Sequence, residues 1–186
     1  MPEAFHSRRL QSLLNRGSDG PHQGRGLRPG AAITVTANLA SSEEALDQFL
    51  DDFEQARIPF SDWTHAAHIT MACCYIRKLP KADLLSTVRR NIKNYNVRGG
   101  GKNTDTSGYH ETLTVLWLWV LADYLESFPA QTPRLEQVRK AVEEFSGNRL
   151  YPEYYSYDVV KSVEARRIWM EPDVKQLPDN GSPLEE

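Results

Sequence analysis

The chain has 186 residues, of which 40% are hydrophobic and 25% charged, and this predicts one domain large enough to bury a core. Its net charge of −3 excludes a nucleic-acid binder that depends on bulk positive charge. No apolar run has the length of a membrane span, and no secretory signal is recognised. Cys73 and Cys74 are adjacent and cannot easily bridge each other, so a reducing, cytoplasmic setting is expected.

Residues 1–40 are predicted to form a flexible tail. They hold five arginines and two acids, a charge of about +3, which leaves −6 for the remainder. The segment 17–30 contains five glycines and two prolines and has almost nothing to bury. An arginine-rich, acid-poor start is also typical of an organellar transit peptide, although this glycine and proline content fits an amphipathic presequence poorly. The best strand signal of the chain, at residues 33–36, is weak.

The folded domain is predicted to span residues 41–178, with a frayed end over residues 179–186. Ser42 precedes two glutamates, a pattern that favours the start of a helix. Apolar residues then recur at helical spacing, and Pro59 ends the helix.

The second predicted helix carries two histidines on its apolar face. Ser61 is its expected N-cap, and Pro80 stops it. The following residues have the spacing of one helix face: His65, His68, Ile69, Ala72 and Ile76. A third helix is predicted over residues 81–95, with its own apolar stripe.

A polar, glycine-rich loop at residues 94–107 precedes the fourth predicted helix. Thr106 or Ser107 is its expected cap, and the helix runs to about Glu126. Because this helix is apolar on nearly every side, it is expected at the centre of a bundle. Two more helices are predicted, over residues 133–145 and 158–169. The fold class is therefore all-α, a compact bundle of five or six helices.

Three histidines are expected to point into the interior. His65 and His68 lie on neighbouring turns of one helix, and His110 begins the apolar face of the fourth. Buried histidines are costly unless each is hydrogen-bonded or bound to something. If the two helices are neighbours, the three imidazoles predict a site for a divalent transition metal. Three histidines suit zinc, whereas two histidines with Glu111 suit iron; Glu111 is alternatively a general base.

Other residues are candidates for contact with a substrate. Tyr109 is a candidate proton donor or a partner of an imidazole. Because the glycine-rich loop leads into the helix that carries His110, its polar side chains are expected near the site. Arg166 is a candidate clamp for a carboxylate or phosphate, or else one half of an ion pair. The predicted substrate-binding residues are Asn103, Thr104, Thr106, Tyr155 and Arg166.

The order of several motifs resembles a family of small, largely uncharacterised helical proteins. The shared blocks are Trp63-x-His65-x-x-His68, Tyr95-Asn96, Asn103-Thr104-x-Thr106-x-Gly108-Tyr109-His110-Glu111-Thr112, Tyr154-Tyr155-Ser156 and Ala165-Arg166-x-x-Trp169-x-Glu171-Pro172. The resemblance covers about residues 45–178, and the Gly-Tyr-His-Glu-Thr block is its most specific part. It implies an intact helical domain and singles out these positions, but it supplies no reaction.

The sequence favours a small metalloenzyme, a metal-dependent hydrolase or oxygenase acting on a small polar or anionic substrate. Its expected cofactor is zinc or iron, and neither a nucleic acid nor a membrane is an expected partner. A metal-free enzyme with a histidine base is one alternative. A small-ligand-binding protein with the histidines in a buried polar network is another, and an adaptor that uses its acidic surface is a third. The sequence assigns no oligomeric state.

Overall fold

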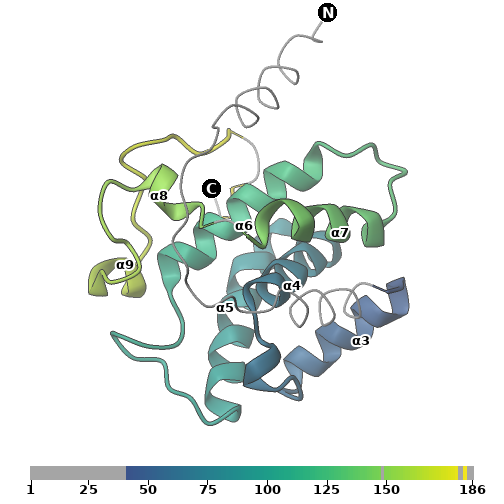
Figure 1. Ribbon diagram of the computed structural model, residues 1–186, viewed down its shortest axis with the longest axis horizontal. Helices are drawn as coiled ribbons and strands as arrows, with labels where there is room; N and C mark the ends of the chain where they lie inside the picture. Colours follow the sequence, from purple (N-terminus) through teal and green to yellow (C-terminus); the bar gives the residue numbers. More distant parts are fainter. Residues whose placement is uncertain (1–40, 148, 180–181, 184–186) are drawn as a thin grey trace, which may run out of the picture.

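The computed structural model describes residues 41–147, 149–179 and 182–183, and the predicted tail, its weak strand signal and most of the predicted frayed end lie outside them. The described residues form seven α-helices and one 3-10 turn, with no strand, which confirms the all-α prediction (Figure 1). The elements are α3 (Glu43–Glu54), η1 (Phe60–Asp62), α4 (His65–Lys78), α5 (Lys81–Arg98), α6 (Glu111–Glu126), α7 (Arg134–Phe145), α8 (Tyr151–Tyr154) and α9 (Val163–Arg167).

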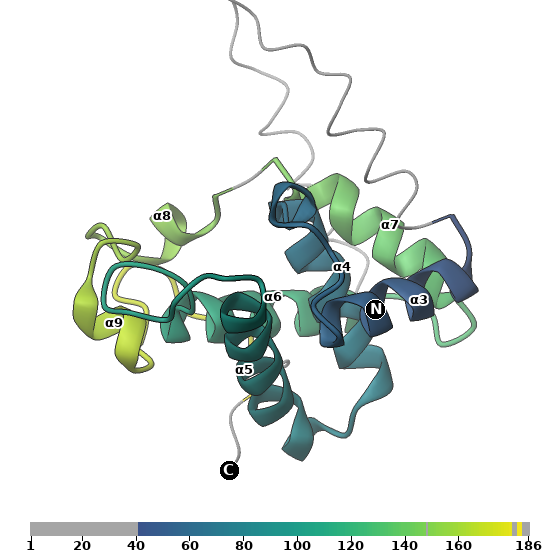
Figure 2. The same ribbon diagram turned by 90° about the horizontal axis from the view of Figure 1, so that it is seen from below.

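Two helices share the centre of the bundle. Helix α4 packs against α3, α5, α6 and α7, and α6 packs against α4, α5, α7 and α9. The prediction placed only the second of these helices, α6, at the centre. Figures 1 and 2 show α8 and α9 together at one end of the molecule and α3 at the other. The two helices that carry the histidine motifs therefore meet in the middle of the fold.

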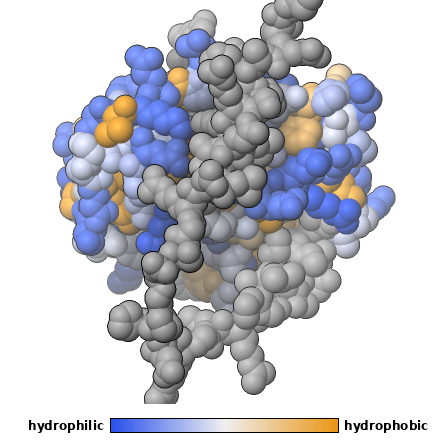
Figure 3. Space-filling view, turned by 45° about the horizontal axis from the view of Figure 1, so that its top comes forward, coloured by the Kyte–Doolittle hydropathy of each residue, from blue (hydrophilic) through white to orange (hydrophobic). Residues whose placement is uncertain are grey.

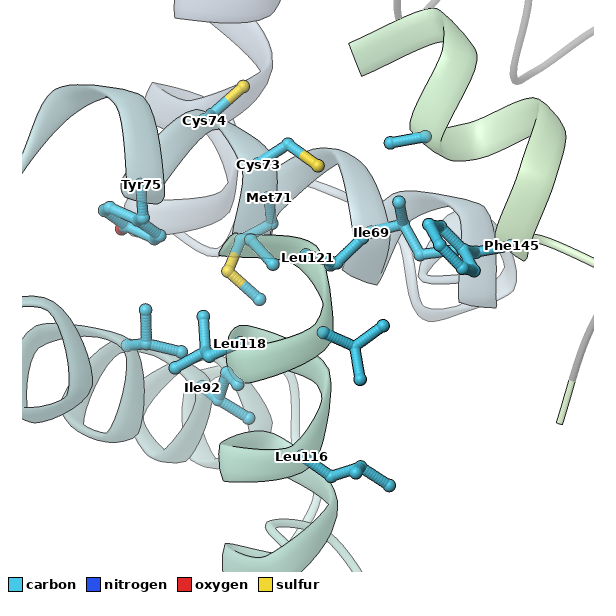
Figure 4. Close-up of a cluster of buried hydrophobic side chains, with 14 of the residues drawn as sticks. Ile69, Met71, Cys73, Cys74, Tyr75, Ile92, Leu116, Leu118, Leu121 and Phe145 are labelled. Carbon is cyan, nitrogen blue, oxygen red and sulfur yellow. The ribbon is translucent and has the colours of Figure 1, made fainter. Parts of the chain in front are cut away.

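The hydrophobic core lies between these helices. Met71 of α4, Ile92 of α5 and Leu118 of α6 lie together in it (Figure 4). Helix α6 buries residues on most of its sides because it has neighbours on most of its sides. The described surface in Figure 3 is mainly hydrophilic, with scattered apolar residues. None of the helices in the described part of the chain combines the length and the apolar character that a bilayer span requires.

Of the predicted caps of the first two helices, one is confirmed and one is wrong. Ser42 caps α3 as expected, and its hydroxyl accepts a hydrogen bond from the Ala45 amide at 3.1 Å. The expected cap of the second helix is wrong: Ser61 lies in η1, and Thr64 caps α4 by accepting from the Ala67 amide. The 3-10 turn uses the residues between Pro59 and the cap, so α4 begins three residues later than Ser61 would place it.

The predicted cap of the central helix is also wrong. Helix α6 begins at Glu111 and His110 is its N-cap, whereas Thr106 and Ser107 lie in the preceding loop. Gly108 has a φ of 78°, a left-handed conformation that prevents a helix from starting before it.

The predicted fifth helix is confirmed as α7. The predicted sixth helix is shorter than expected: residues 159–161 form a turn, and the helix α9 spans only Val163–Arg167. Helix α8 was not predicted.

Candidate functional site

A cavity of about 440 Å³ lies between α4, α5 and α6. This volume is within the range of small-molecule sites. Most of its walls are aliphatic or aromatic, and the polar groups are few. The lining residues are Trp63, His65, His68, Ile69, Met71, Ala72, Val88, Ile92, Asn96, Gly108, Tyr109, His110, Leu113, Thr114, Trp117, Leu118 and Leu121.

The faces of α4 and α6 that the sequence predicted line this cavity from two sides. Four of the five residues on the predicted face of α4 line it, and only Ile76 does not. On the other side, His110 and the apolar residues that follow it on α6 at helical spacing form the opposite wall. The three histidines thus line one cavity, two of them from α4 and one from the start of α6.

His68 presents one nitrogen as a hydrogen-bond acceptor. Its Nδ1 lies 2.7 Å from the carbonyl oxygen of Thr64, and because a carbonyl only accepts, Nδ1 carries the proton. No hydrogen bond to its Nε2 is found among the residues that the structure describes. Burial lowers the pKa of His68 to about 4, against the opposing effect of the Thr64 carbonyl. The ring is therefore neutral near pH 7, with a lone pair on Nε2.

Aromatic contacts hold the two imidazoles of α4 in place. The ring of His68 lies 4.2 Å from Trp63, centroid to centroid, and Trp63 stacks in turn on Phe53 at 4.6 Å. The ring of His65 meets Trp117 edge-on at 4.7 Å. Both imidazoles are thus packed against indole rings at the cavity wall.

His110 has a structural role that occupies both of its ring nitrogens. Its Nδ1 accepts a hydrogen bond from the Leu113 amide at 3.3 Å, which caps α6. Its Nε2 lies 3.1 Å from the carbonyl oxygen of Val159, so Nε2 carries the proton. Burial lowers the pKa of His110, which favours this neutral form.

The carboxylate of Glu111 pairs with an arginine beside the cavity. Arg89 on α5 donates to its two oxygens at 2.5 and 3.0 Å, and the Tyr109 hydroxyl donates at 2.9 Å. Glu111 is not among the lining residues, although Tyr109 is. Burial, with the Glu111 charge nearby, raises the pKa of Tyr109.

The donor set does not fit the predicted metal centre. No group of three His, Cys, Asp or Glu side chains within the described ranges is arranged to hold a metal ion. A metal ligand needs a free lone pair, and the one on His110 accepts the amide of Leu113. The carboxylate of Glu111 is committed to Arg89. The structure therefore places the three histidines around a cavity without forming the predicted three-histidine metal site.

The predicted substrate-binding residues of the loop do not line the cavity. Asn103 ties the loop to α5: its Oδ1 accepts from the side chain of Asn96 and the amide of Tyr109, and its Nδ2 donates to a carbonyl of α5. Thr104 accepts weakly from the amide of Thr106 at 3.4 Å, and both residues are exposed.

The other two predicted substrate-binding residues also bond within the fold. Arg166 donates to the carbonyl oxygens of Gly108, Tyr109 and Val160, which holds α9 against the loop. Tyr155 is buried and donates to the carbonyl oxygen of Met170 at 2.8 Å. Neither residue lines the cavity.

The predicted site residues did not include two residues beside the cavity. Asn96 contributes polar lining; the resemblance singled out its position, and its place one helical turn after Ile92 was a further signal. Arg89 neutralises Glu111, and nothing in the sequence pairs these residues, which lie 22 positions apart on different helices.

Two variants of His110 test whether this residue caps α6 or binds a metal ion. We expect His110→Ala to lower the free energy of unfolding by about 2 kcal/mol, because it removes a cap and a buried hydrogen bond. His110→Asn keeps a good cap and should recover about half of this. In urea unfolding, zinc should leave the midpoint of the wild type unchanged. A zinc-dependent rise that His110→Asn abolishes would contradict the capping role.

No family model, curated protein or solved structure matches this chain.

Proposed function

We propose that the protein binds a small, predominantly apolar molecule in the cavity between α4, α5 and α6. The observation that carries the proposal is the cavity itself: about 440 Å³ of space, with mostly apolar walls and its histidines gathered from two helices. Small-molecule sites typically combine such walls with a few polar groups that orient the ligand. We propose His68 as the main orienting group, because its Nε2 accepts hydrogen bonds and Trp63 fixes its ring.

The properties of His68 favour binding over proton abstraction. A general base works best when its pKa is close to the pH at which it operates. The pKa of His68, lowered to about 4, leaves it a weak base but a good neutral acceptor. A metal-dependent reaction is not part of the proposal, because the donor set does not fit a metal. We propose the cytoplasm as the compartment, since Cys73 and Cys74 are free, buried thiols.

A substitution that fills the cavity tests the proposal. Ala72 lines the cavity and is buried, so Ala72→Phe should occupy its space with a ring. We expect para-ethylphenol to bind the wild type with a Kd on the order of 0.1 mM and to lose all measurable binding to Ala72→Phe. Isothermal titration calorimetry measures both, and the fluorescence of the lining residues Trp63 and Trp117 provides a second readout.

The matched control is Ala130→Phe, which adds the same ring at an exposed position away from the cavity. It should bind the probe as the wild type does. Circular dichroism and thermal unfolding establish that Ala72→Phe is folded. A folded Ala72→Phe that binds the probe with unchanged affinity would place binding outside the cavity and contradict the proposal.

A further inference from the structure

We infer that the ligand is an uncharged molecule that carries a hydrogen-bond donor, an O–H or N–H group, for Nε2 of His68. This inference rests on the proposed function and narrows its ligand class. It departs from the anionic substrate that the glycine-rich loop and Arg166 suggested in the sequence. The chemistry of the cavity wall carries it.

The wall offers no charge to pair with an ionic ligand. None of the described residues that line the cavity is an aspartate, glutamate, lysine or arginine. Burying an ion without a partner is far more costly than burying a neutral polar group. An uncharged ligand avoids that cost, and its apolar part matches Ile69, Leu118 and the other aliphatic side chains of the wall.

Three cationic side chains that contact residues at the cavity already have partners within the fold. Arg89 is paired with Glu111, and Arg166 donates to three backbone carbonyls. Lys93 lies over the ring of Tyr109, 4.7 Å from its centroid. Glu111 also occupies the first turn of α6, where an anion would otherwise gain from the helix dipole. An incoming carboxylate would therefore have to break one of these pairings and approach a buried negative charge.

The hydrogen bonds of four polar residues in the wall favour a ligand that donates to His68. His68 presents the lone pair of Nε2, whereas its proton is committed to the Thr64 carbonyl. Thr114 donates its hydroxyl proton to the His110 carbonyl, and Tyr109 donates its own to Glu111. Asn96 donates through its amide to Asn103. Each of these side chains directs a donor to a partner within the fold, while Nε2 of His68 offers an acceptor to a ligand.

Three probes of one shape test the inference by calorimetry at pH 8, above the usual pKa of histidine. They are para-ethylphenol, which is a donor, para-ethyltoluene, which has no polar group, and para-ethylbenzoate, which is an anion. We expect the phenol to bind about fivefold more tightly than the toluene, the effect of one net hydrogen bond. The benzoate should bind at least about a hundredfold more weakly than the phenol.

The variant His68→Phe should lower the affinity for the phenol to that for the toluene and leave the toluene unchanged. If this variant does not fold, ring-nitrogen NMR of the wild type decides. The Nε2 resonance of His68 must then shift with the phenol and not with the toluene.

The outcomes separate the two proposals. If none of the three probes binds the wild type, the proposed function fails and the inference fails with it. If the benzoate binds as tightly as the phenol and Ala72→Phe abolishes both, the cavity is a ligand site but the inference is wrong. If the phenol keeps its advantage over the toluene in folded His68→Phe, the donor is bound by another group and the assignment of His68 is overturned.

Discussion

Gly108→Ala should destabilise the protein by about 3 kcal/mol or more, whereas Gly100→Ala should cost only about 1 kcal/mol. Both glycines have positive φ values, 78° for Gly108 and 89° for Gly100, so alanine is strained at either position. They differ in the space around them. A Cβ on Gly108 would lie 2.3 Å from the carbonyl oxygen of Lys102 and 2.8 Å from Oδ1 of Asn103, while a Cβ on Gly100 meets nothing within 4 Å.

The clash at Gly108 has a consequence for the site. To relieve it, Asn103 must move, and this breaks its hydrogen bonds to Asn96 and to the amide of Tyr109. We therefore expect Gly108→Ala to weaken probe binding as well as folding, and Gly100→Ala to leave binding intact. Urea unfolding compares the two variants directly. A difference of less than about 1 kcal/mol between them would show that the loop adapts freely and that the close approach is unimportant.

Arg89→Ala should lower the free energy of unfolding by about 3 kcal/mol, because it leaves the carboxylate of Glu111 buried without its partner. The chain offers a matched control in Arg167, which donates to Asp105 through the same two-pronged geometry at 2.5 and 2.8 Å. The two pairs differ in burial: the side chain of Glu111 is 10% exposed and that of Asp105 is 51% exposed. Arg167→Ala should therefore lower the free energy of unfolding much less than Arg89→Ala, because water screens an exposed pair.

A second substitution identifies the source of the loss. In Arg89→Ala the destabilising group is the unpaired charge, so adding Glu111→Gln should recover part of the stability while keeping an acceptor for the Tyr109 hydroxyl. Chemical unfolding of the single and double variants measures this. Equal losses for Arg89→Ala and Arg167→Ala would mean that Glu111 reaches solvent and that its burial has no energetic effect.

The sequence predicted those parts of the fold that depend on local chemistry. Ser42 and the two glutamates after it predicted the start of α3, because a cap needs only the residues beside it. The spacing of His65, His68 and Ala72 predicted that they share one face of α4, and all three line the cavity, because helical periodicity sets which residues lie on one side. The long apolar run of α6 predicted a helix with neighbours on most sides.

The remaining features depend on contacts between distant segments. The sequence predicted that His110 lies inside its helix. In the structure the positive φ of Gly108 delays the start of α6, and His110 is its N-cap. Histidine is not a favoured capping residue, so no local signal identified this role. The partners of Glu111 and Arg166 are set by how α5, α6 and α9 pack against one another, which residue spacing does not encode.

A crystal of the protein soaked in para-bromophenol shows where a phenol binds, because the anomalous signal of bromine locates the ligand. We expect one strong bromine peak among the aliphatic side chains of the cavity, with the phenol oxygen within hydrogen-bond distance of Nε2 of His68. A bromine peak outside the cavity, or a phenol oxygen bound to Arg166 or to a metal ion held by the histidines, would contradict it.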